Sequence, residues 1–157
     1  MPEISDRLPR PRVCNVCGHK KVNLVIDYNT QKRMYRCTAC DARVYCHKGS
    51  TAPTGYLANK HTRQLRIKAH DAFDPLWIDR LITRDEAYDW LARQLNLERK
   101  DAHIGRLSDE QLNRIISRAP RYKIKLENKN AKQKAKQDAS YRRQHIAKRS
   151  RRKKQRK

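Results

Sequence analysis

The sequence predicts an α+β fold in which a short β-rich segment is followed by a helical segment and a strongly basic tail. Three observations support this prediction. Two C-x2-C pairs frame two short β-prone runs within residues 13–48, residues 56–119 carry apolar side chains at helical spacing, and Lys and Arg dominate residues 120–157. A cluster of Gly, Ser, Thr and Pro predicts a linker at residues 49–55, and the proline-containing residues 1–12 predict a flexible arm.

The two cysteine pairs predict a metal site. Cys14 and Cys17 form the first pair and Cys37 and Cys40 the second, with nineteen residues between the pairs. Each pair supplies two thiolates from one tight turn, and four thiolates at this spacing suit a single tetrahedral Zn2+. Four sulfur ligands leave no open position for water or substrate, so the ion is expected to be structural. Two disulfides are the alternative, but the chain shows no apolar signal stretch and the thiols should meet a reducing cytoplasm.

Short runs beside the cysteine pairs predict the strands of a zinc ribbon. Residues 21–26 and 33–36 have the composition of strands and are separated by the turn-like residues 27–30, and residues 43–46 offer a third strand. Roughly thirty residues of this kind cannot bury enough apolar surface to fold alone. Metal binding is expected to supply the missing stability, which is about 10–16 kcal/mol for structural zinc in small peptides.

The helical segment predicts a small module with its own core. Residues 56–73 form an imperfect helical pattern with a break near residues 59–62, and Asp74 should end it because the residue before a proline avoids the helical conformation. Capping boxes at residues 83–86 and 108–111 predict the starts of two further helices, the second closed by Pro120. Phe73, Trp77 and Trp90 are the expected anchors of one core of about sixty residues.

The charge of the chain predicts a polyanionic partner. Lys and Arg number 39 against 16 Asp and Glu, which gives a formal net charge of +23. Residues 119–157 contain 17 of these cations and only two acids, Glu127 and Asp138. Such a tail attracts nucleic acid by counterion release, largely without selecting sequence. The tail has no apolar face to pack, so it is expected to be disordered or to become helical on contact. The alternative is a tail that only improves solubility.

The expected contacts with nucleic acid are exposed cations that reach backbone phosphates of DNA or RNA without catalysis. On the ribbon they are Lys20, Lys21, Lys32, Arg33, Arg36, Arg43 and Lys48. In the tail they are Arg142, Arg143, Lys148, Arg149, Arg151, Arg152, Lys153 and Lys154. A membrane partner is not expected, because the tail forms no broad hydrophobic face and no run approaches transmembrane length. The pattern carries no signal for an oligomeric state.

Two other functions remain open from the sequence. Cys46, His47, His61 and His70 could form a second metal site. Separately, the three histidines with Asn59 supply the residue types of a His-Asn-His nuclease. Against this, no acidic residue adjoins His47, and the cysteine pairs do not bracket the motif in the usual way. Cys46 is expected to be a partly buried small side chain instead. A protein-binding adaptor or inhibitor that docks on a host enzyme is the third possibility.

Motifs after the second cysteine pair carry a resemblance to a known family. In the ribbon these are Cys40–Asp41–Ala42, Val44, His47, Gly49, Pro53, Gly55, Leu57 and Ala58. In the helical segment they are Leu65–Arg66, Ala69–His70, Phe73–Asp74–Pro75–Leu76–Trp77, Arg84, Ala87–Tyr88, Trp90–Leu91–Ala92 and His103–Ile104–Gly105. Over residues 13–117 the chain resembles a zinc-finger family of uncharacterised proteins found mainly in bacteriophages and prophages.

This resemblance implies a zinc ribbon joined to a small helical module, a phage or prophage origin and a location in the host cytoplasm. It implies no activity. The chain departs from the family pattern at Thr54, where a leucine is expected, and in the long basic extension after Pro120. The function of that extension is therefore predicted from its charge alone.

Overall fold

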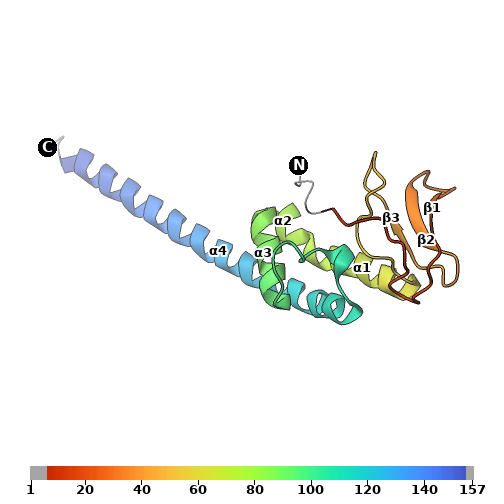
Figure 1. The fold of residues 1–157 in the computed structure, drawn as a ribbon. Coiled ribbons are helices and arrows are strands. Elements are labelled where there is room, and N and C mark those ends of the chain that lie inside the picture. Colours follow the sequence, from red (N-terminus) through yellow and green to blue (C-terminus); the bar gives the residue numbers. More distant parts are fainter. Residues whose placement is uncertain (1–6, 155–157) are drawn as a thin grey trace.

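A computed structural model describes residues 7–154, with side chains up to Ile146. The expected arm at residues 1–12 and the tail at 120–157 therefore lie partly outside the described residues. The elements in chain order are β1 (Val22–Ile26), β2 (Arg33–Cys37), β3 (Arg43–Tyr45), α1 (Lys60–Phe73), α2 (Pro75–Ile78), α3 (Arg84–Leu95), the 3-10 helix η2 (Ile104–Arg106) and α4 (Asp109–Lys154). The sheet lies at one end of the molecule and α4 extends away from the other (Figure 1), so the predicted α+β fold is confirmed.

The three strands form an antiparallel sheet in the order β1-β2-β3. Leu24 pairs with Tyr35, and Tyr35 pairs with Val44, so these three side chains share one face of the sheet. Tyr35 and Val44 are buried on that face. The core of the ribbon consists of Cys14, Tyr35, Cys37, Ala42, Val44 and Leu57.

The segment after β3 belongs to the ribbon, which corrects the predicted helix over residues 56–73. Ala58 exchanges two backbone hydrogen bonds of 3.1 Å with Arg43, and Pro53 bridges to Cys46, so this segment covers the outer edge of β3. Leu57 and Ala58 are buried beside the sheet. The helix α1 begins only at Lys60, because the side chain of Asn59 accepts a hydrogen bond from the Thr62 amide and caps its first turn.

A close backbone approach joins the ribbon to the helical module. The amide of Tyr56 donates to the carbonyl oxygen of Gly105 over 2.9 Å. A Cβ atom placed on Gly55 would lie 2.2 Å from that same oxygen, so only glycine fits at this position. The two cores are therefore held together through main-chain contact at η2.

The helical module has the core that its apolar spacing predicted. Phe73, Leu76, Leu91, Leu112 and Ile115 are fully buried, and α1, α3 and α4 supply most of the surrounding side chains. Phe73 and Trp90 are buried as expected, and Trp77 is partly buried against the same core. Both capping boxes are present, one at the start of α3 and one between Ser108 and Gln111 at the start of α4.

Pro120 does not end the last helix, so that prediction is wrong. Proline lacks the amide that an inner helical turn needs, at a typical cost of about 3 kcal/mol. Here the helix continues because side chains on both sides of the proline pack into one core. Ala119 and Leu126 are buried there, and the Tyr122 ring stacks on Trp90 with 4.8 Å between centroids. The core of the helical module thus reaches Leu126, beyond the predicted boundary at residue 119.

Beyond Leu126 the helix leaves the body of the protein. Every side chain from residue 127 to residue 146 is exposed. This part of the chain was expected to be disordered or helical on contact, and the structure describes it as helix. It contributes charge to the surface and nothing to the described cores.

The extended core leads to a stability prediction. Leu126→Ala should lower the free energy of unfolding by about 2 kcal/mol, because it removes a buried side chain and leaves a cavity. Ile124→Ala is the matched control: Ile124 lies on the same helix but is 56% exposed, and the loss should be about 0.5 kcal/mol. Thermal or urea denaturation measures both. Equal effects of the two substitutions would show that α4 does not pack beyond Pro120.

Candidate metal centre and nucleic-acid interface

The four cysteines converge from two turns. Cys14 and Cys17 precede β1, and the amide of Gly18 donates to the Cys14 carbonyl over 2.8 Å with Gly18 at a φ of 73°. Cys37 ends β2 and Cys40 lies in the turn before β3. The Cys14 and Cys40 sulfurs are 3.6 Å apart, as are those of Cys17 and Cys37, and all four lie within 4.8 Å of one another. The strands and turns thus place four sulfurs around one point.

This arrangement fits one tetrahedral zinc ion. Zn–S bonds of about 2.3 Å in a tetrahedron place the sulfurs about 3.8 Å from each other. A disulfide would need about 2.05 Å, and the described cysteines are all free. The disulfide alternative is therefore excluded in this structure. Four thiolates complete the shell of the ion, so the site holds zinc for structure and offers no position for a reacting molecule.

Backbone amides around the second cysteine pair favour the thiolate form of Cys37. Burial acts to raise the pKa of Cys37, but hydrogen bonds from the backbone of Cys40 and Ala39 and from the Cys17 side chain lower it to about 7. At Cys40 the backbone of Ala42 acts to lower the pKa, while the neighbouring cysteine sulfurs and burial raise it to about 12. Crowded thiolates repel one another, and a divalent cation among them removes that repulsion.

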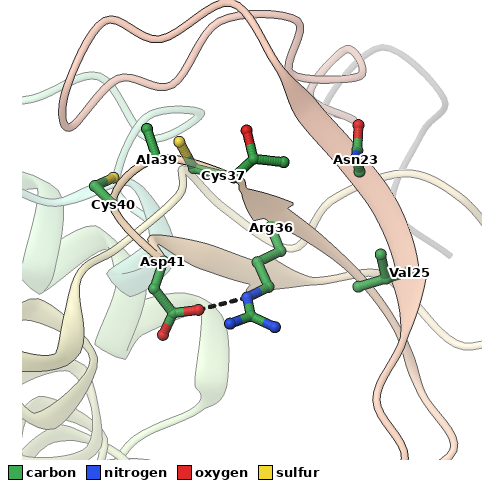
Figure 2. Close-up of a pocket in the computed structure, with 8 residues that line it drawn as sticks. Asn23, Val25, Arg36, Cys37, Ala39, Cys40 and Asp41 are labelled. Carbon is green, nitrogen blue, oxygen red and sulfur yellow. Dashed lines mark hydrogen bonds and ion pairs between the residues drawn. The ribbon is translucent and has the colours of Figure 1, made fainter.

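An exposed ion pair lies beside the second cysteine pair. The Arg36 guanidinium on β2 donates to the Asp41 carboxylate in the following turn, next to Cys37 and Cys40 (Figure 2). Arg36 was predicted to contact nucleic acid. Its charge is already partnered by Asp41, which makes it a weaker contact for phosphate than an unpaired cation.

The proposed second metal site does not assemble. Among residues 7–146, the cluster of Cys14, Cys17, Cys37 and Cys40 is the only group of three or more His, Cys, Asp or Glu side chains placed to hold one ion. His61 and His70 are nine residues apart on α1, which is two and a half turns and about 13 Å along the axis. They therefore lie on opposite sides of the helix.

All of these side chains except that of His47 have a local structural contact. His61 lies 3.8 Å from Asp109, His70 lies 3.1 Å from Asp74, and the Asn59 side chain caps α1. Cys46 is half-buried against the ribbon core with its sulfur 3.7 Å from the Thr51 carbonyl oxygen, and burial raises its pKa. His47 lies in the exposed turn after β3, with its amide bonded to Ala52.

The predicted cations of the ribbon do not form one patch. Lys20 and Lys21 precede β1, whereas Lys32 and Arg33 lie at the other end of the β1–β2 hairpin. The five residues of β1 separate the two groups by about 17 Å. Arg43 is half-buried, and Lys48 lies in the turn after β3. Lys20, Lys21, Lys32 and Arg33 therefore flank the β1–β2 hairpin at its two ends instead of covering one face.

A basic stripe on α4 is the surface that sequence inspection missed. Its members follow one another at steps of three, four or seven residues and therefore lie on one side of the helix. They are Arg118, Arg121, Lys125, Lys129, Lys132, Lys136 and Arg143. The two acids of the tail, Glu127 and Asp138, fall on roughly the opposite side. None of the seven cations forms an ion pair with another described residue.

The stripe continues onto the folded body. A shallow groove between α3 and α4 is lined by Arg93, Arg118, Arg121 and Lys125 around the stacked rings of Trp90 and Tyr122. The Arg118 guanidinium donates to the Gln94 side chain over 2.9 Å. Of the tail residues predicted to contact nucleic acid, Arg143 lies on the stripe and Arg142 beside it. Lys148, Arg149, Arg151, Arg152, Lys153 and Lys154 are in the last turns of α4, where side chains are not described.

A comparison with known protein families identifies the family of this chain. Residues 10–122 match a family described as a zinc-finger-containing domain. The chain belongs to this family. The match includes all four cysteines and both cores up to Tyr122, and together with the sulfur geometry it assigns one structural zinc ion to the chain. No curated protein and no solved structure matches the chain.

The family match ends at Tyr122, shortly before the exposed part of α4. Residues 123–154 of this helix therefore lie outside the matched zinc-finger-containing domain. No described helix has the length and apolar character that are needed to cross a membrane.

The metal centre leads to a prediction with an internal control. Purified protein should contain one zinc per chain, and Cys37→Ser should lose it, because three thiolates bind the ion less tightly than four. Cys46→Ser should keep it, since Cys46 lies outside the cluster. Metal analysis by mass spectrometry measures both. A zinc content below half an equivalent in the unsubstituted protein would contradict the assignment.

Proposed function

We propose that the protein binds nucleic acid, DNA or RNA, without catalysing a reaction on it. The observation that carries this proposal is the basic stripe on α4. Its cations are exposed, form no ion pair with an acid among the described residues and follow one side of a helix that projects away from the cores. A row of unpaired cations on a rod suits an extended polyanion better than a compact ligand.

The dimensions of the stripe support this partner. From Lys125 to Arg143 the helix rises by about 27 Å, at 1.5 Å per residue. Duplex DNA carries one charge per about 1.7 Å of its axis, so phosphates are available along the whole length. Contacts of this kind release condensed counterions and fix position on the backbone, but they do not select bases.

The ribbon cations play a secondary part in the proposal. Lys20, Lys21, Lys32, Arg33 and Lys48 are exposed and can meet phosphates, but they are dispersed around the hairpin. The groove between α3 and α4 supports a larger contribution from the body, because four of its lining residues are cations. We therefore expect the body and the projecting helix to share the contact.

A charge-matched pair of variants tests the stripe. Lys132→Gln with Lys136→Gln removes two cations from the stripe, whereas Lys134→Gln with Arg142→Gln removes two cations that lie outside it on α4. The full-length protein should show a log–log salt slope on duplex DNA of roughly −4 to −7, and the first pair should reduce its magnitude by about 1.8. The second pair should change it by less than about half as much, since these side chains point away from the bound strand.

Binding is measured by fluorescence anisotropy over a salt series, with circular dichroism to verify that helix content is unchanged. Equal effects of the two pairs would show that cations on every side of the helix contribute alike. That result would contradict a specific role for the stripe. Failure of the full-length protein to bind DNA or RNA at low salt would overturn the proposal itself.

The proposal that the contact is non-enzymatic has its own test. His47, His61 and His70 are separated in the structure, so incubation with Mg2+ or Mn2+ should leave plasmid DNA and RNA uncut. Metal-dependent cleavage that disappears in His47→Ala or His70→Ala, with zinc content retained, would establish a nuclease instead.

We also propose a phage or prophage origin and a location in the host cytoplasm. Both rest on the motifs between residues 40 and 105 that resemble the phage-borne zinc-finger family. A gene neighbourhood without phage structural or integration genes would argue against this origin.

A further inference from the structure

One edge of the ribbon sheet has no partner among residues 7–154. The outer edge of β3 is covered by residues 52–58, whereas β1 pairs only with β2. The Lys21 carbonyl accepts from Thr38, and the Asp27 amide donates to Lys32, so the odd-numbered residues of this strand turn their backbone groups toward β2. Alternation then turns the amides and carbonyls of Val22, Leu24 and Ile26 outward. No hydrogen bond to these groups is present in the described part of the chain.

This edge lacks the usual protection of an exposed strand. Charged side chains, proline or a bulge normally discourage another strand from pairing. The five residues of β1 contain no charge and no proline, and their register with β2 is continuous. Three exposed side chains here are apolar: Leu24 is 42% exposed, Ile26 is 64% exposed and Tyr28, just beyond the strand, is 89% exposed. Asn23 is an exposed polar side chain on the other face of the strand.

Cations stand at both ends of the free edge. Lys20 and Lys21 precede β1, and Arg33 lies opposite Ile26 at the other end with Lys32 beside it. The nearest acid, Asp27, is occupied by the Tyr45 hydroxyl and the Asn29 amide, and the Tyr45 hydrogen bond chiefly holds its pKa below the usual value. The edge therefore offers an apolar centre between two positive ends.

We propose that the outer edge of β1 is a docking strand for an extended, acidic segment of a partner protein. A polypeptide fits this edge because its backbone supplies alternating amides and carbonyls at strand spacing, which a nucleic acid does not. Acidic residues at the ends of the segment match the flanking cations. This inference is independent of nucleic-acid binding and gives an adaptor role a defined surface.

Charge argues against a second copy of the chain as the occupant. In an antiparallel pair of β1 strands centred on Leu24, Lys21 of one copy would face Asp27 of the other, and Lys32 and Arg33 would lie one strand further away. The net charge of +23 opposes self-association. The sheet and the projecting part of α4 lie at opposite ends of the molecule (Figure 1), so a peptide on β1 leaves the stripe accessible.

The test uses the zinc-bound full-length protein and a synthetic peptide of alternating Val and Thr with Glu at both ends. In amide hydrogen exchange followed by NMR, the peptide should protect the amides of Val22, Leu24 and Ile26 and leave those of α4 unchanged. A peptide with Lys in place of Glu should bind at least tenfold more weakly. Protection of no β1 amide at millimolar peptide, or shifts confined to α4, would overturn the proposal.

A matched pair of variants separates edge pairing from general attraction between charges. Ile26→Glu places a negative charge on the edge and should weaken peptide binding at least tenfold. Ile67→Glu makes the same change at a 62% exposed position on α1 and should change it less than twofold. Both variants should keep their zinc and their salt-dependent binding to DNA, so failure here is distinguishable from failure of the proposed function. Equal loss in both variants, or protection of β1 amides by dimerisation without peptide, would contradict the proposal.

Discussion

Four thiolates around one zinc ion hold the amino-terminal third of this protein together. The core of the ribbon contains two of the ligands, Cys14 and Cys37, among only a few apolar side chains. Such a core cannot offset the entropy of ordering three short strands, and the metal bonds supply the difference. The ion fixes the start of β1 against the turn between β2 and β3. Residues 52–58 cover the outer edge of β3, and no described residue pairs with the outer edge of β1.

The last helix combines two physical roles within one element. Up to Leu126 it is a core helix, held by apolar packing that outweighs the lost hydrogen bond at Pro120. After Leu126 no described side chain is buried, and the same helix becomes a charged rod. Helical periodicity continues across the change, so cations at steps of three and four residues remain on one side. A stripe that starts beside Trp90 and Tyr122 is therefore continuous with the body.

The two proposed surfaces select their partners by different chemistry. The stripe offers point charges along a line and suits phosphates. The β1 edge offers backbone hydrogen bonds and apolar side chains and suits a polypeptide strand. Gly55 and Gly105 lock the ribbon to the helical module by main-chain contact, so the two surfaces are carried on one connected body. A protein built in this way can hold a partner protein close to a nucleic acid.

The sequence by itself determined the features that depend on local chemistry. Cysteine spacing specified the zinc ligands, because two C-x2-C turns bring four sulfurs together, and the capping boxes specified where α3 and α4 begin. Tertiary packing decided the rest. It placed Leu57 and Ala58 in the ribbon and carried α4 through Pro120. These outcomes depend on which apolar surfaces meet across the fold. A local sequence pattern does not contain that information, because the free energy of burial overrides local helix propensity only when distant segments pack together.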